Sequence, residues 1–200
     1  MPSYTRIAPV APNPSLNSNV RRHEKRMHPF NELIHRSTAF SLSALEAASQ
    51  RVSESLEASA ATPLVKALQM IQLQKAISAV GMFSIFDAVL QRELHCKDGF
   101  PEAMKVLAAL GVSALKDRFY DLQLAINVLK HGKGRSYDEL VQKAASLPFR
   151  IKLPGEAFFE EGDVGEISSL IKVDNPFVLL CAEVIEAVSF AIKGKSAHGA

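Results

Sequence analysis

The sequence predicts an all-α fold, a helical bundle of about five principal helices with a small β or loop excursion near residues 149–173. Three observations favour this class. Apolar residues recur at steps of three and four over long segments, which is the period of an amphipathic helix. Proline, glycine, serine and threonine residues occur where these segments begin and end. With 48% hydrophobic residues, the 200-residue chain can bury the core of one domain.

The composition divides the chain into two regions. Residues 1–29 are rich in proline and contain the basic run RRHEKR, so they are expected to form a flexible arm rather than part of a core. Residues 30–200 are expected to form a single helical-bundle domain. The net charge is only +2, from 23 Lys and Arg against 21 Asp and Glu, so total charge neither requires nor excludes a nucleic-acid partner.

Cysteine usage and apolar segments limit the classes of protein further. Cys96 and Cys181 lack the spacing of a zinc site, so we expect no metal and no cofactor. The longest apolar stretch, residues 76–90, is shorter than a membrane span, and no signal-peptide pattern occurs at the N-terminus. We therefore expect a cytoplasmic protein with no membrane partner.

The first two predicted helices span residues 31–58 and 62–94. The apolar face expected for the first consists of Leu33, Phe40, Leu42, Leu45, Ala48, Val52 and Leu56. Thr62 is expected to cap the second helix, because Pro63 follows it and suits the first turn. The second half of this helix is apolar nearly all round, as expected of the central helix of a bundle. Within it, Gly81 is expected to mark close packing or a slight bend.

Two further helices are predicted in the middle of the chain. A short one opens at Pro101 and is closed by Gly111. A long one is capped by Ser113, and its apolar residues step by four, three, four and three. It should end at Lys130 or His131, because the next residue is a glycine that suits the left-handed position after a helix.

The last third of the chain combines two helices with an irregular segment. Ser136 and Glu139 have the spacing of a capping box at the start of a helix. Residues 149–173 contain two short runs with strand-like character on either side of an acidic, glycine-containing segment, which predicts a small hairpin or an ordered loop. Asp174 starts the last helix, which we expect to end at Lys193.

A candidate functional site lies in the stretch NVLKHGKGRS, residues 127–136, where one helix ends and the next begins. Cationic side chains and the amides of a helix start can converge there on a phosphate group. The candidate phosphate- or nucleic-acid-binding residues are Asn127, Lys130, Lys133, Arg135, Ser136 and Tyr120, and the candidate catalytic residue is His131. A purely structural interpretation stays open, because Lys and His also complement the dipole at a helix C-terminus.

The sequence resembles the HEPN-like group of prokaryotic helical domains, because its penultimate long helix ends in N-x-x-K-H at Asn127, Lys130 and His131. The resemblance implies RNA or nucleotide binding, or metal-independent RNA cleavage of a toxin or defence type, commonly by a homodimer. His131 would then act as general acid or base beside cations that stabilise phosphate charge. The group's arginine, four to six residues before the histidine, is absent, since Arg118 lies farther back. Whether the protein is an enzyme stays open.

The alternative function is a non-catalytic module that binds a protein partner of unknown identity through its helical surface. Exposed apolar faces on two long helices would favour a homodimer in either case. An acidic segment consists of Glu156, Glu160, Glu161, Asp163 and Glu166. Without the ordering of a calcium loop, it is expected to be solvated or salt-bridged, or to fold over the basic stretch. The sequence does not identify the physiological ligand.

Overall fold

The computed structural model of the chain describes residues 30–59, 61–156, 165 and 167–198. The chain divides into two units, Met1–Phe30 and Asn31–Ala200, and apart from Phe30 all described residues belong to the second. The arm predicted for residues 1–29 lies outside the described residues. The predicted all-α class is confirmed, because the described part consists of the α-helices α2 to α7, one turn of 3-10 helix and their connections.

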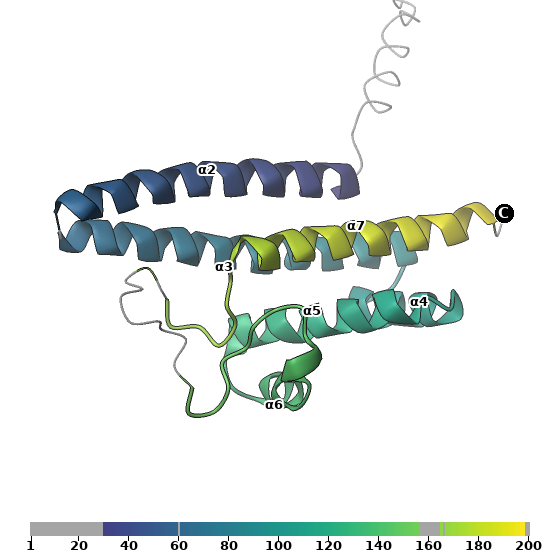
Figure 1. Cartoon of the computed structure of the whole chain (residues 1–200). Helices are drawn as coiled ribbons and strands as arrows, with labels where there is room; N and C mark the ends of the chain where they lie inside the picture. The colour runs from purple at the N-terminus through teal and green to yellow at the C-terminus, as the bar shows by residue number, and fades with distance from the viewer. Residues whose placement is uncertain (1–29, 60, 157–164, 166, 199–200) are drawn as a thin grey trace, which may run out of the picture. The chain divides into compact units, whose positions relative to one another are not determined.

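The helices α2 (Phe30–Ala58) and α3 (Thr62–Leu94) form an antiparallel hairpin (Figure 1). Their extents match the prediction, and the predicted apolar face of α2 is correct in part. Leu42 is buried and Leu45, Ala48, Val52 and Leu56 are half-buried, as expected of that face. The prediction is wrong for Leu33, which is 49% exposed, and for Phe40, which is 77% exposed. The buried residues of α2 are Asn31, Ile34, Thr38 and Leu42. The buried stripe therefore includes two polar residues and leaves two large apolar side chains in solvent.

The start of α3 differs from the prediction by one residue. Pro63 lies in the first turn, as expected, but the residue before the helix is Ala61, and no side chain caps it. Thr62 is already helical, so it is not the N-cap. Pro63 in the first turn therefore marks the start of α3, and the predicted threonine cap does not form.

The core lies where α3 packs against three other helices. α3 contacts α4 (Gly99–Ala109), α5 (Ser113–His131) and α7 (Asn175–His198), as expected of a central helix, and it lies beside α7 (Figure 1). At the centre of the core is the ring of Phe119 on α5, which is fully buried. Its centroid lies 6.2, 6.0 and 5.5 Å from the rings of Phe83, Phe86 and Phe100. This aromatic cluster joins α3, α4 and α5.

Close packing of glycine occurs at Gly99 and not at Gly81. A Cβ atom added to Gly81 would meet nothing within 4 Å, so the predicted close packing there is wrong. A Cβ atom at Gly99 would lie 2.7 Å from the Asp87 carbonyl oxygen and 2.7 Å from the Leu90 Cβ. α4 begins at Gly99, two residues before the predicted Pro101, because the missing side chain lets its first turn approach α3.

Glycines end two of the helices as the sequence predicts. Gly111, after α4, and Gly132, after α5, have φ angles of 72° and 73°, in the left-handed region that favours glycine. α5 ends at His131, and the Gly132 amide donates to the Val128 carbonyl. The predicted cap at Ser113 is wrong, because α5 follows Val112 and has no side-chain cap.

The excursion at residues 149–173 is smaller than a hairpin of two full strands in the described residues. Ile151 and Ile171 form an isolated antiparallel bridge. The Tyr137 hydroxyl of α6 (Arg135–Gln142) donates to the Lys152 carbonyl at 2.7 Å, which ties the excursion to α6. A small β excursion is therefore present, and a tertiary hydrogen bond adds to its backbone pairing.

α7 starts as predicted and ends later. The Asp174 Oδ1 atom accepts a hydrogen bond from the Phe177 amide at 3.0 Å, which is the geometry of an N-cap. The helix continues to His198, five residues beyond the predicted end at Lys193.

One helix of the described residues, α3, is long and apolar enough to cross a membrane by length and composition alone. The apolar stretch at residues 76–90, on which the expectation of no membrane span rests, is by itself too short for a span. Of the apolar window in α3, 39% is buried within the molecule. Core helices of globular proteins pass the same test, so this property by itself does not identify a membrane segment.

Candidate functional site

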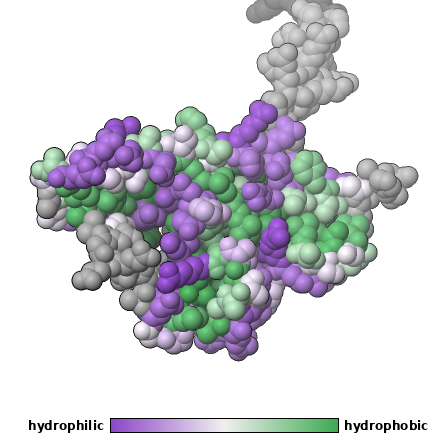
Figure 2. Space-filling view, in the orientation of Figure 1, coloured by the Kyte–Doolittle hydropathy of each residue, from purple (hydrophilic) through white to green (hydrophobic). Residues whose placement is uncertain are grey.

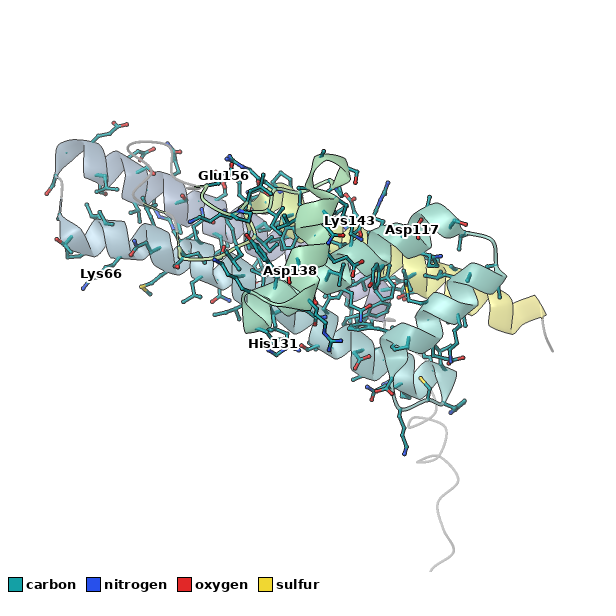
Figure 3. All side chains as sticks on the ribbon, turned by 90° about the horizontal axis from the view of Figure 1, so that it is seen from below. Lys66, Asp117, His131, Asp138, Lys143 and Glu156 are labelled. Carbon is teal, nitrogen blue, oxygen red and sulfur yellow. The ribbon has the colours of Figure 1, made fainter. Side chains whose placement is uncertain are left out.

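The predicted basic stretch forms the turn between α5 and α6, at one edge of the domain. We call Lys130, His131, Lys133 and Arg135 the basic turn. All four side chains are exposed, and in the described part of the chain none of them makes a hydrogen bond or an ion pair. Figure 3 labels His131 and shows its side chain at the outer edge of the helices. The structure therefore brings three predicted cations and His131 together around one turn, with their side chains exposed to solvent.

The N-terminus of α6 adds backbone donors to this turn. The residue before the helix is Gly134, and no side chain caps it. Because the first intrahelical bond here runs from the Asp138 amide to the Gly134 carbonyl, the amides of the three preceding residues have no intrahelical acceptor. Such amides, with the helix dipole, favour an anion. Asp138 also lies in this first turn, and its carboxylate reduces the local positive charge.

Glu139 does not form the predicted capping box with Ser136. Ser136 lies inside the first turn of α6 and caps nothing, while the Glu139 carboxylate points to α5. There it accepts a hydrogen bond from the Tyr120 hydroxyl at 3.0 Å. Tyr120 was predicted to bind phosphate, but in this structure its hydroxyl is engaged in joining α5 to α6.

Lys143 completes a cluster of charged and aromatic groups between α5 and α6. Its Nζ atom lies 2.6 Å from Asp121 Oδ1, 3.4 Å from Glu139 Oε1 and 5.0 Å from the centre of the Tyr120 ring. Burial alone would lower the pKa of Lys143, but the hydrogen bonds and charges of Asp121 and Glu139 outweigh it and raise this pKa. Burial first, and then the hydrogen bond to Glu139, raise the pKa of Tyr120.

The raised pKa values predict a loss of stability at alkaline pH. The ordinary values are 10.0 for Tyr120 and 10.5 for Lys143, and folding raises both. Their contribution is therefore complete below about pH 10 and is lost as the pH rises further. We expect the free energy of unfolding to fall between about pH 8 and about pH 11, and to fall less in Tyr120→Phe. Denaturant unfolding at both pH values measures this, and an equal loss in both proteins would contradict the assignment.

Two other predicted residues of the site, Asn127 and Ser136, are half-buried. Neither side chain has a hydrogen-bond partner among the residues that the structure describes. Asn127 lies one turn before the end of α5, on the helix that carries Lys130 and His131. Both side chains therefore remain candidates for polar contacts to a ligand at the basic turn.

The geometry around His131 lacks a partner that would orient it for catalysis. No described carboxylate or hydroxyl is hydrogen-bonded to its ring. Arg118 lies thirteen residues earlier on the same helix, roughly 20 Å along the axis at 1.5 Å per residue. The arrangement therefore offers phosphate contacts more clearly than acid–base chemistry.

The other chemical candidates contribute no site in the described residues. No group of three or more His, Cys, Asp or Glu there is placed to hold a metal ion. Glu156 binds Arg150 at 2.9 Å and accepts from the Leu153 amide, and these contacts lower the Glu156 pKa, the amide bond first. The rest of the acidic segment lies outside the described residues, so its predicted position over the basic turn is not observed.

A groove that the sequence pattern does not predict lies between α2 and α3, with one lining residue from α7. It has a volume of about 240 Å³ and is lined by Ile34, Ser37, Thr38, Ser41, Leu42, Leu45, Ser78, Gly81, Met82, Ile85 and Val178. Thr38 is 6% exposed, and within the described residues its hydroxyl has no hydrogen-bond partner. The groove exists because Gly81 has no side chain and serines face α3 across it. Helical periodicity, which locates apolar faces, carries no signal for such a gap.

Large apolar side chains are also exposed on the hairpin. Figure 2 shows hydrophobic residues reaching the surface between hydrophilic ones on the face drawn. The exposed large apolar residues on α2 and α3 are Leu33, Phe40, Met70, Leu73, Ile77 and Ile85. Isolated exposed apolar residues are common on protein surfaces, and four of these six lie on α3.

Comparison with known protein families, with curated proteins and with solved structures finds no match for this chain.

Proposed function

We propose that this protein binds the phosphates of single-stranded RNA at the basic turn, as the resemblance to HEPN-like domains implies. The observation that carries the proposal is the grouping of four exposed and unpaired cationic or titratable side chains around an uncapped helix start. In the described residues no carboxylate neutralises Lys130, Lys133 or Arg135 by an ion pair. Such groups bind phosphate by charge-assisted hydrogen bonds.

Binding at this turn should depend on salt in a predictable way. Each phosphate neutralised on a single strand contributes about −0.7 to the slope of log affinity against log salt concentration. We expect Lys130→Ala, Lys133→Ala and Arg135→Ala in one chain to weaken binding and to reduce the slope by about 2. Fluorescence anisotropy of a labelled RNA oligonucleotide over a series of salt concentrations measures both quantities.

The matched control removes three exposed cations elsewhere, with Arg36→Ala, Arg51→Ala and Lys97→Ala. This variant has the same net charge, so a turn-specific site predicts near-normal binding. If both variants lose the same affinity, the binding is general electrostatic attraction and the site is wrong. If neither loses affinity, or the unmodified protein binds no RNA at low salt, the proposed function is wrong.

Catalysis is the further step that the resemblance implies, with His131 as general acid or base. The experiment compares RNA cleavage by the unmodified protein and by His131→Ala, at equal concentrations and after the same purification. Cleavage that disappears in the variant supports a ribonuclease. If cleavage is equal in both proteins, or absent from both, His131 is not a catalytic residue. The proposal is then limited to phosphate binding.

A second candidate function is a non-catalytic protein-interaction module. The specific observation in its favour is the exposure of Met70, Leu73 and Ile77 on α3, at 68%, 50% and 53%. Neither RNA binding nor the core explains why a long helix presents these side chains to solvent.

A further inference from the structure

The groove between α2 and α3 contains a buried hydroxyl group that has no hydrogen-bond partner in the described residues. This group belongs to Thr38, which lines the groove and is only 6% exposed. By contrast, the Ser37 hydroxyl donates to the backbone carbonyl three residues before it, at 3.1 Å. The Ser78 hydroxyl likewise donates to the carbonyl four residues before it, at 2.8 Å. Because an unbonded buried hydroxyl is unfavourable, a molecule that bonds to Thr38 in the groove gains affinity from it.

The lining of the groove is mostly apolar and carries no charge. Six of its eleven residues have large apolar side chains: Ile34, Leu42, Leu45, Met82, Ile85 and Val178. A carboxylate or an ammonium group would lose its hydration here and would find no opposite charge. The groove therefore favours a neutral molecule with a large apolar part.

The groove is long in relation to its volume. α2 and α3 run side by side (Figure 1), and the lining on α2 extends from Ile34 to Leu45, eleven steps or roughly 16 Å at 1.5 Å per residue. A cavity of roughly 150 Å³ is large enough for benzene. A volume of about 240 Å³ that is spread over this length therefore suits an extended chain better than a ring system.

Two hydrogen bonds between α2 and α7 lie just beyond the two ends of the groove. Asn175 Nδ2 donates to Glu46 Oε2 at 3.0 Å, one residue after the last groove residue of α2. Lys193 Nζ donates to Asn31 Oδ1 at 3.0 Å, three residues before the first. These bonds hold α2 to the domain on both sides of the groove, while the small residues between them leave it open. The groove is therefore formed before any ligand binds, as most ligand sites are.

We propose that this groove binds a neutral single-chain amphiphile, an alkyl chain of about eight to ten carbons with a hydroxyl head group. The chain lies between the apolar side chains of α2 and α3, and the head group exchanges a hydrogen bond with the Thr38 hydroxyl. The apolar lining, the lack of charge and the single unbonded buried hydroxyl together specify this class of ligand. The site is separate from RNA binding, because no residue of the basic turn lines the groove.

Titration of the full chain with 1-octanol, followed by carbon-13 NMR of the methyl groups, tests the site. The methyl groups of Ile34, Met82 and Ile85 line the groove, so their signals should shift together and saturate. The signals of Ile126, which is buried on α5, should not shift. Shifts that never saturate, or that are largest at the exposed Ile77 outside the groove, would show general association of the alcohol with apolar surface. Either result would overturn the proposal.

Sodium octanoate tests the charge of the ligand, because it has a chain of the same length with an ionised head group at neutral pH. It should bind at least about tenfold more weakly than 1-octanol, since the lining has no cation to replace the hydration of the carboxylate. Octanoate that binds as tightly as 1-octanol would contradict the assignment of a neutral ligand.

Thr38→Val tests the polar contact, because it replaces the hydroxyl by a methyl group of similar size. The variant should bind 1-octanol about threefold to tenfold more weakly, which corresponds to the loss of one hydrogen bond. It should stay folded, since the substitution removes an unbonded buried polar group. Thr62→Val is the matched control on an exposed threonine outside the groove, and it should bind normally. Equal affinities in the two variants would overturn the contact with Thr38.

Gly81→Leu tests the space itself. A Cβ atom at Gly81 would meet nothing within 4 Å, so a leucine there can occupy the groove and should abolish the saturable shifts. Ser84→Leu is the matched control, because it adds the same side chain to an exposed position of α3 outside the groove. Circular dichroism establishes that both variants are folded. If Gly81→Leu binds 1-octanol as tightly as the unmodified protein, the groove is not the site and the proposal is wrong.

Discussion

Gly99→Ala should lower the free energy of unfolding by about 2–3 kcal/mol, although it adds only one methyl group. The new Cβ atom would lie 2.7 Å from the Asp87 carbonyl oxygen and 2.7 Å from the Leu90 Cβ. The Asp87 oxygen is a backbone atom of α3 and the Leu90 Cβ is bonded directly to that backbone, so neither can move without shifting the helix. α4 would have to withdraw from α3, and the contact between the two helices would loosen. Denaturant unfolding followed by circular dichroism measures the change.

Gly81→Ala is the matched control. Gly81 lies in α3 and is the glycine for which the sequence predicted close packing. Its Cβ atom meets nothing within 4 Å, and alanine is a better helix former than glycine by about 1 kcal/mol. The control should therefore be stabilised. If both variants lose similar stability, close approach at Gly99 is not the cause. The pair separates a steric requirement for glycine from the general cost of glycine in a helix.

The contrast between these glycines shows what the sequence can and cannot predict here. The extents of the helices follow from local signals, so α2, α3 and the end of α5 lie within a residue or two of their predicted bounds. Whether Gly81 or Gly99 touches another helix depends on how α4 crosses α3, and nothing near either residue in the sequence encodes that crossing. Local chemistry specifies where helices begin and end, and packing decides which face is covered.

In the candidate site, too, some features follow from the local sequence and others depend on tertiary packing. The basic turn was predictable because its four residues lie within six positions of one another and Gly132 ends α5 between them. The role of Tyr120 was not, because its partner Glu139 lies nineteen residues away, on a different helix. The S-x-x-E spacing predicts that Glu139 caps its own helix, but its carboxylate binds the Tyr120 hydroxyl and the Lys143 ammonium group instead. Together these two interactions are stronger than one hydrogen bond to a backbone amide of the same helix.

Phe119→Ala should have the largest effect of any single change, a loss of about 3–5 kcal/mol in the free energy of unfolding. The ring is fully buried and lies within 6.2 Å of three other phenylalanine rings, counted between centroids. Its removal leaves a cavity where α3, α4 and α5 meet. It also removes edge-to-face contacts with Phe86 and Phe100, each worth about 0.5–1.5 kcal/mol.

Phe190→Ala is the matched control, because this ring is 58% exposed on α7 and its removal should change stability by no more than about 0.5 kcal/mol. Similar losses in the two variants would contradict the core assigned here. Phe119 lies three turns before His131 on α5, so this core also holds the helix that carries the basic turn. If Phe119→Ala remains folded, its RNA affinity separates two possibilities. Unchanged affinity shows that the turn binds as a local unit, and weakened affinity shows that binding requires α5 to be fixed against α3.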